Sequence, residues 1–162
     1  MFALNEKVVY PGHGVAHISC IVQKVVGGSV TKFFELTFYN KEMTILVPMG
    51  SSKAAGIRRL SSIENVSNAL KILAEPIKIN YENSSSNWNR RNKDYQCKLR
   101  SGNLYDICKI YRDLKRISVR KELSFGEKNL LCKTESLIAE EISIVTNVQE
   151  DKTIKQLRSL FS

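Results

Sequence analysis

Short apolar runs separated by turn residues fill the first sixty positions of the chain. Residues 7–10, 15–22, 32–39 and 43–48 are rich in β-branched and aromatic side chains, which favour strands. Glycine, proline and short polar stretches separate these runs and are typical of turns. Four or five short strands in so few residues can bury one core only by curling. The pattern therefore predicts a small β-barrel over residues 1–60.

After Gly56 the apolar positions recur every three or four residues, which indicates amphipathic helices. Ser61 and Glu64 have the spacing of a capping box, so we expect the first helix to start there. Pro76 is expected to end this helix. Four apolar residues follow the box at helical spacing: Ile63, Val66, Leu70 and Leu73.

Further turn and capping signals divide the rest of the chain. A polar stretch at residues 82–87 precedes a helix that runs to about Arg100, and a third helix follows Ser101 and Gly102. A second capping box, Ser124 with Glu127, opens a longer helix. The chain is therefore predicted to be α+β, with an all-α domain over residues 61–162. Residues 146–162 hold a last amphipathic segment, a candidate tail helix.

The positive charge of the chain is concentrated in one segment. The 162 residues carry a net charge of +9, and between Trp88 and Lys121 eleven Lys or Arg residues accompany only three Asp residues. Such a concentration favours a polyanionic partner, although a solvated helical surface is the alternative explanation. Polar residues interrupt the segment, which suits a nucleic-acid groove better than a membrane surface.

The sequence lacks the patterns of the common enzyme and metal classes. No nucleophile elbow, phosphate-binding loop or zinc-protease motif is present, and the four cysteines form no C-x-x-C pair. His13 and His17 would lie about 13 Å apart on a strand, too far to share a metal. We expect no catalytic residue, no metal and no cofactor. Without a secretory signal or a membrane-spanning run, the expected location is the cytoplasm, with reduced thiols.

Trp88, the only tryptophan, stands at the start of a predicted helix among polar and basic residues. One interpretation is a tryptophan packed in the core or between domains. The other is an exposed aromatic that stacks on or wedges between bases. Arg90, Arg91 and Lys93 would then neutralise phosphates on either side of it. The residues by themselves leave both interpretations open.

Five segments stand out along the chain: Val8–Ala16 (VVYPGHGVA), Ile45–Pro48 (ILVP), Asn87–Lys93 (NWNRRNK), Arg112–Leu114 (RDL) and Leu123–Lys128 (LSFGEK). In this order they resemble the CarD/CdnL family of RNA polymerase-binding bacterial transcription regulators. The resemblance covers about residues 2–147, and its strength lies in the order of the five segments, since each alone is modest.

The resemblance implies a fold and two partners. The N-terminal module of such proteins is a Tudor/SH3-like barrel that binds the RNA polymerase β subunit and also occurs in the transcription-repair coupling factor. The helical domain meets promoter DNA at the upstream edge of the transcription bubble. By position, Trp88 would enter the minor groove, and Arg90 and Lys93, with Arg91 as a further candidate, would hold the backbone. A monomeric regulator, associated with the nucleoid through the polymerase, is expected.

On the polymerase side, Lys24 matches one basic position of the family, and the other basic position is occupied by Leu46. This departure implies a more apolar polymerase contact. An alternative function is that of a non-sequence-specific RNA-binding or ribosome-associated protein, which would use the same basic helix. That alternative gives the β module no role, and binding to the polymerase β subunit distinguishes the two.

Overall fold

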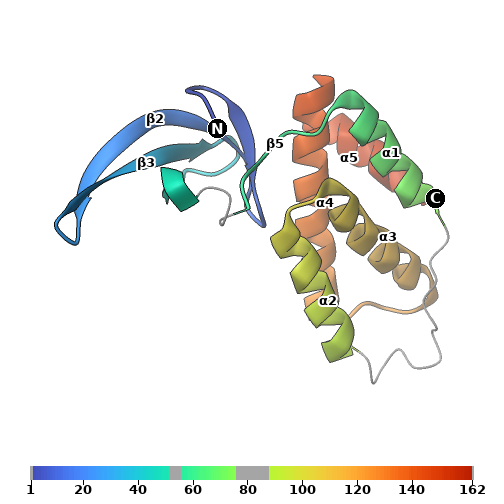
Figure 1. Ribbon diagram of the computed structural model, residues 1–162. Helices are drawn as coiled ribbons and strands as arrows, with labels where there is room; N and C mark the ends of the chain where they lie inside the picture. The colour runs from blue at the N-terminus through green and yellow to red at the C-terminus, as the bar shows by residue number, and fades with distance from the viewer. Residues whose placement is uncertain (1, 52–55, 76–87, 162) are drawn as a thin grey trace. The chain divides into compact units, whose positions relative to one another are not determined.

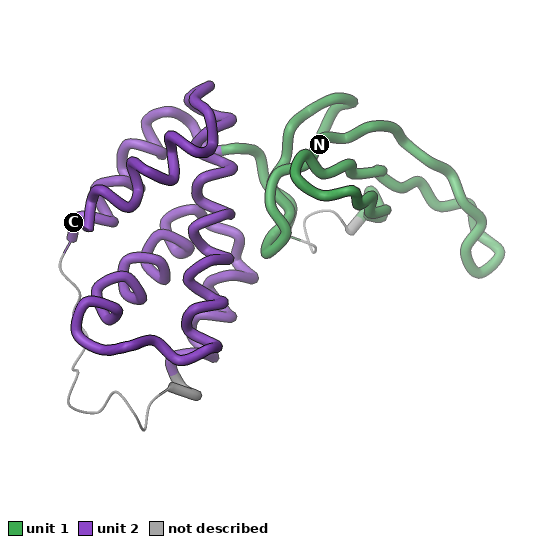
Figure 2. Tube along the Cα trace, turned by 180° about the vertical axis from the view of Figure 1, so that it is seen from behind, with its two compact units in different colours: residues 1–60 green, residues 61–162 purple. Residues whose placement is uncertain are grey.

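The computed structural model describes residues 2–51, 56–75 and 88–161, with the side chains of residues 2–50, 56–75 and 91–161. Its contacts divide the chain into two compact units, residues 1–60 and residues 61–162 (Figure 1 and Figure 2). Each unit has its own hydrophobic core.

Unit 1 is an antiparallel sheet of five strands in the order β4-β3-β2-β1-β5. The first four strands form a meander, and the fifth returns to pair with the first. β2 and β3 are long and strongly curved (Figure 1). The strands are β1 (Lys7–Tyr10), β2 (Gly14–Val26), β3 (Ser29–Phe38), β4 (Thr44–Pro48) and β5 (Arg58–Arg59), with a short 3-10 helix, η1 (Met49–Ser51), after β4.

One face of this sheet forms the core. In β3, Phe34, Leu36 and Phe38 are buried, whereas the residues between them are half-buried, which is the alternation of a sheet covered on one side. The predicted strands are confirmed, but β2 and β3 extend beyond the predicted ranges. Their pairing continues to the turn at Gly27 and Gly28, whose positive φ angles of 58° and 81° suit glycine.

The two histidines pack against aromatic rings in this unit. The His13 ring lies 5.2 Å from the Tyr10 ring, in the turn between β1 and β2. The His17 ring lies 5.2 Å from that of Tyr39. Within the described part of the chain, no three His, Cys, Asp or Glu side chains gather as metal ligands would.

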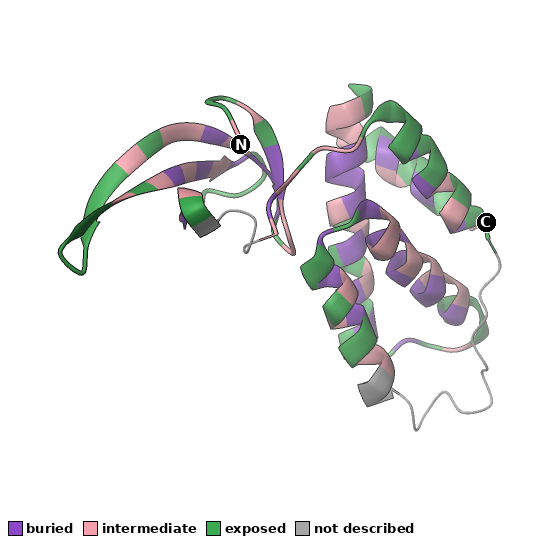
Figure 3. Cartoon of the chain, viewed as in Figure 1, coloured by how far each residue is buried: buried purple, intermediate pink, exposed green. Residues whose placement is uncertain are grey.

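Unit 2 is a bundle of helices, so the predicted α+β class is confirmed. Its core is centred on α3, which buries Ile110, Tyr111 and Leu114 completely (Figure 3). None of the described helices is both long enough and apolar enough to span a membrane. The helices are α1 (Ile63–Ala74), α2 (Trp88–Ser101), α3 (Leu104–Arg120), α4 (Phe125–Thr146) and α5 (Glu150–Ser159).

The two predicted capping boxes have different outcomes. The box at Ser124 and Glu127 is confirmed, since each side chain binds the backbone N–H of the other. The box at Ser61 is wrong, because Ser62 caps α1 and accepts from the Asn65 N–H. Ser61 instead donates its N–H and hydroxyl to Glu141 Oε2, at 2.9 and 2.6 Å. The predicted end at Pro76 and the loop at 82–87 lie outside the described residues.

The last helix is held on the bundle by a polar cluster around Glu135. Tyr111 Oη donates to Glu135 Oε2 at 2.8 Å, and Arg158 donates to both carboxylate oxygens, at 2.8 and 3.2 Å. Burial opposes ionisation of Glu135, but the bonds from Arg158 and Tyr111 outweigh it and lower its pKa. The Phe161 ring packs edge-on against Tyr111 at 5.7 Å. The predicted amphipathic tail is thus a helix with Leu157 fully buried.

Candidate functional site

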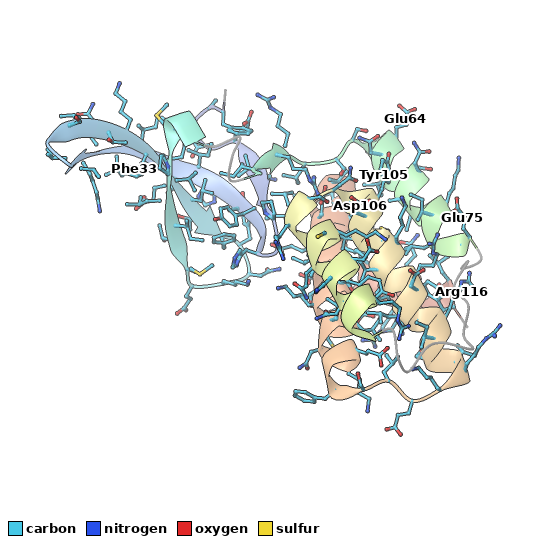
Figure 4. The ribbon with its side chains drawn as sticks, turned by 60° about the horizontal axis from the view of Figure 1, so that its bottom comes forward. Phe33, Glu64, Glu75, Tyr105, Asp106 and Arg116 are labelled. Atoms are coloured by element: carbon cyan, nitrogen blue, oxygen red, sulfur yellow. The ribbon has the colours of Figure 1, made fainter. Side chains whose placement is uncertain are left out.

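The two residues predicted to bind polymerase lie on the same face of the sheet in unit 1. Lys24 of β2 pairs with Thr31 of β3, and Leu46 of β4 pairs with Glu35 of β3. Thr31 and Glu35 are four residues apart on one strand, so their side chains leave the sheet on the same side. Lys24 is exposed and Leu46 is half-buried. We call this side, opposite the core, the outer sheet face. It also carries Phe33 (Figure 4).

Glu35 lies at the centre of the outer sheet face. Cys20 Sγ donates to its Oε2 at 2.8 Å, and Ser19 Oγ lies 3.0 Å from the same oxygen. The bond from Cys20, then that from Ser19, lowers the pKa of Glu35, and the charge of Lys24 acts in the same direction. The bond to Glu35 also raises the pKa of Cys20, so the thiol stays protonated at neutral pH. The carboxylate is therefore ionised and held in place.

A β-bulge in β2 produces this arrangement. The register between β2 and β3 shifts between Ile18 and Cys20, so Ser19 and Cys20 both lie opposite Glu35. Thr37 Oγ1 donates to Ser19 Oγ at 3.1 Å and completes the cluster. Glu35 was not predicted as a site residue, and no sequence signal marks the bulge.

The tip of the β2–β3 hairpin is apolar and exposed. Val25 and Val30 pair across the strands and are 72% and 67% exposed, and Val26 is 55% exposed. Figure 3 shows this end of the hairpin as exposed on both strands. Neighbouring exposed valines on a soluble domain are typical of a protein-binding surface.

All four residues predicted to bind DNA lie in the first two turns of α2, which begins at Trp88. Lys93 is exposed, whereas Arg91 is half-buried with its Nε and Nη1 atoms in the interior. The side chains of Trp88 and Arg90 lie outside those that the structure describes. Arg91 thus has the environment of a packing residue, whereas Lys93 is open to solvent.

Arg91 belongs to the buried stripe of α2. Tyr95 and Leu99, one and two turns further on, are 2% and 4% exposed. Burial raises the pKa of Tyr95, the negative charges of Asp113 and Glu127 add to the rise, and Arg91 opposes it. The carboxyl groups of Asp113 in α3 and Glu127 in α4 are buried in the same unit.

Part of the positive charge that was predicted to contact a polyanion instead forms ion pairs and hydrogen bonds within the bundle. Arg112 bonds to Asp113 at 3.2 Å and to Glu75 at 3.3 Å, and its side chain is only 13% exposed. Arg116, beside the end of α1 in Figure 4, donates to the Ala74 carbonyl at 3.3 Å. Both arginines neutralise the negative C-terminal end of α1. The charge open to DNA is thus smaller than the composition indicates.

Comparison with known proteins agrees with the order of the two units. Residues 2–61 match the model of the CarD-like/TRCF RID domain, and residues 68–158 match that of the CarD C-terminal domain. The chain is 24% identical over 159 residues to the "Putative transcription factor YdeB" of Bacillus subtilis, covering 98% of this chain and 99% of that protein.

Among solved structures, the chain is similar to the solution NMR structure of the 72-residue N-terminal domain of Myxococcus xanthus CarD. The identity is 32%, the coverage is 36% of this chain and 79% of the other, and the TM-score is 0.32. The two family models together span nearly the whole chain, and the second alone matches more than half of it. The chain therefore belongs to the CarD-like family, whose members are RNA polymerase-interacting transcription factors.

Proposed function

We propose that the chain binds the RNA polymerase β subunit through unit 1 and promoter DNA through unit 2, and thereby stabilises the open complex. The observation that supports this most directly is the match of the two CarD models, in order, to two separate compact units. A protein that bound RNA alone would have no use for the first unit. The β subunit, the promoter and a monomeric state are parts of this proposal.

On the polymerase side, the outer sheet face provides the contact. Lys24 supplies an exposed positive charge, and Leu46 supplies a half-buried apolar side chain near the fixed Glu35 carboxylate. β4, which carries Leu46, is at the edge of the sheet order. An edge strand can accept a further strand through its backbone, so an apolar side chain is compatible with recognition there. The apolar hairpin tip adds contact area of the same kind.

On the DNA side, α2 provides a wedge and phosphate contacts. Trp88 enters the minor groove at the upstream edge of the bubble, and Arg90 and Lys93 hold the neighbouring phosphates. A melted promoter collapses when its strands pair again at this fork, and a ring placed there must first be displaced. Stacking of one base on an aromatic ring contributes about 1–3 kcal/mol. Since about 1.4 kcal/mol changes an equilibrium tenfold, one tryptophan is sufficient to prolong the open complex.

The two contacts depend on each other. Phosphate contacts by a few basic residues bind DNA weakly at physiological salt. Attachment of unit 1 to the polymerase makes DNA binding by unit 2 an intramolecular step, with an effective concentration set by the linkage. A single chain therefore acts at the promoter that its polymerase occupies, and needs no sequence-reading helix of its own.

The test combines co-purification and footprinting. The tagged full-length chain should retain the polymerase β subunit from purified core enzyme, and should extend protection at the upstream fork of a linear promoter. Retention of ribosomal particles or free RNA, with no retention of the β subunit, would contradict the proposal and support the RNA-binding alternative.

A further inference from the structure

A hydrophobic and basic patch lies where α3 ends and α4 begins. Phe125 is 82% exposed and Val119 is 76% exposed, the two highest values among the large hydrophobic side chains that the structure describes. Arg120, next to Val119 in the chain, and Lys128, about one turn after Phe125, are exposed, and Lys121 is half-buried. We call these five residues the corner patch. Exposed aromatic and basic side chains in alternation are typical of surfaces that bind single-stranded nucleic acid.

The corner patch lies at the same end of unit 2 as the start of α2. Only two residues separate α2 from α3, and α3 runs in roughly the opposite direction, so the start of α2 and the end of α3 lie towards the same end of the unit (Figure 1 and Figure 2). α4 begins at this end as well. Tyr95 of α2 and Leu130, in the second turn of α4, belong to the same hydrophobic core.

The exposure of Phe125 has no folding role to explain it. The start of α4 is fixed by the reciprocal bonds between Ser124 and Glu127, at 3.1 and 3.3 Å, which do not involve the Phe125 ring. A large ring left in water contributes nothing to the stability of the unit. Arg120, Lys121 and Lys128 outnumber the exposed acidic neighbour Glu122, which forms an ion pair with Lys128 at 3.4 Å. The net charge near the ring is therefore positive, which suits a polyanion and opposes a basic partner.

We propose that Phe125 is a second aromatic contact of the DNA-binding surface and stacks on an unpaired base at the fork. This inference rests on the proposed function, because α2 must first bring the fork to this end of the unit. The positive charges of the corner patch hold the phosphates on either side of the stacked base. An unpaired base offers a free face to the ring, whereas bases inside a duplex do not, so the contact favours forked DNA.

The test uses the full-length chain and two fluorescein-labelled DNAs, a fork with a short unpaired segment and the matching full duplex. The variants are Phe125→Ala, Phe125→Tyr and Ile63→Ala. Ile63 is a matched control, since it is 70% exposed and, like Phe125, is the first residue of a helix capped by serine. Anisotropy titrations at several salt concentrations give the affinity and its salt dependence.

Phe125→Ala should bind the fork about fivefold to tenfold more weakly, with the same slope of log K against log salt, because a stacking contact releases no counterions. Phe125→Tyr should restore fork binding, and Ile63→Ala should bind like the wild type. Unchanged fork binding by Phe125→Ala would overturn the inference, and so would equal losses on fork and duplex. Loss of polymerase retention with normal DNA binding would also overturn it, in favour of a protein contact.

The proposed function is tested separately in the same titrations. If the wild type binds neither DNA, or if Lys93→Ala changes nothing, the DNA-binding role of unit 2 fails whatever Phe125 does. If the wild type binds and Lys93→Ala weakens it while Phe125→Ala does not, only the inference on Phe125 fails.

Discussion

The outer sheet face and the basic end of the helical unit differ in how their charges are surrounded. On the sheet, the Glu35 carboxylate accepts from Cys20 at 2.8 Å and lies 3.0 Å from the Ser19 hydroxyl. In the helical unit, Lys93 is exposed, and Lys128 is exposed and pairs with the likewise exposed Glu122 at 3.4 Å. Contacts of the first kind depend on geometry over a few ångströms. Exposed charge acts over about 10 Å and is screened by salt.

This difference indicates that the two surfaces suit different kinds of partner. The outer sheet face suits a partner with a fixed surface, and the basic end suits a flexible polyanion whose position varies. We therefore expect polymerase binding to depend mainly on shape and DNA binding mainly on ionic strength. Substitutions at Trp88, Leu46, Lys93 and Glu35 test this comparison, in order of the effect expected.

Trp88→Ala should shorten the lifetime of the open complex about tenfold, because the lost stacking contribution is on the order of 1.4 kcal/mol. The lifetime is measured by challenging preformed complexes on a linear promoter with a competitor. Retention of the polymerase β subunit should not change, since that contact belongs to unit 1. An unchanged lifetime would rule out the wedge.

A control for this variant is needed, because position 88 continues the stripe of Tyr95 and Leu99 along α2. Trp88→Phe keeps an aromatic ring and should retain most of the lifetime. Thermal unfolding of both variants should match the wild type. If Trp88→Ala instead lowers the unfolding temperature by several degrees, packing rather than wedging accounts for the residue.

Leu46→Asp should weaken binding to the polymerase β subunit about fivefold, since a desolvated carboxylate at an apolar contact costs about 1 kcal/mol or more. Calorimetry or a surface-based assay with purified polymerase measures the change. Leu46→Arg should bind with a steeper salt dependence than the wild type. If both variants bind like the wild type, the contact lies elsewhere in unit 1.

Lys93→Ala should weaken DNA binding about threefold at moderate salt and reduce the slope of log K against log salt by about 1, the value for one phosphate contact. Arg91→Ala should instead reduce the stability of unit 2, because two of its side-chain nitrogens are in the interior. Urea unfolding beside the DNA titration separates the two effects. A smaller salt slope for Arg91→Ala at normal stability would show that it contacts phosphate.

Glu35→Gln should have the smallest effect of the four. It should lower the free energy of unfolding only at a pH above the acid range. The pKa of Glu35 is lowered by the bonds from Cys20 and Ser19, so the stabilisation from its charge is present above the unfolded-state pKa. It is lost as the pH falls through the lowered folded-state pKa. Urea unfolding should therefore show a difference between wild type and Glu35→Gln at pH 7 that disappears at low pH. A difference that grows towards low pH would contradict this sign.

The sequence predicted the elements whose signals are local. Runs of β-branched and aromatic residues between turn residues marked the strands of unit 1, and the box at Ser124 and Glu127 marked the start of α4. The box at Ser61 failed because Glu141, eighty residues away, binds Ser61 instead. β5 is only two residues long and shows no periodicity, so pairing with β1 is what defines it.

The candidate site was predictable only in part, for similar reasons. The motif around Trp88 indicated which helix to consider, and the sheet register brought Lys24 and Leu46 onto one face. Glu35 could not be identified from the sequence, because the groups that donate hydrogen bonds to it lie on another strand and face it only because of the bulge. The burial of Arg91 follows from helical spacing with Tyr95 and Leu99, a pattern that the surrounding charge obscured.

The bulge at Ser19 has a consequence for how this sequence tolerates changes in length. Because Ser19 and Cys20 share one partner, deletion of Ser19 would leave every later residue of β2 on its present side of the sheet. Insertion of a residue elsewhere in the strand would turn Lys24 towards the core side and Ile21 away from it. Gaps of one residue among relatives should therefore gather at this point of β2, and an alignment that places them elsewhere would misassign the outer face.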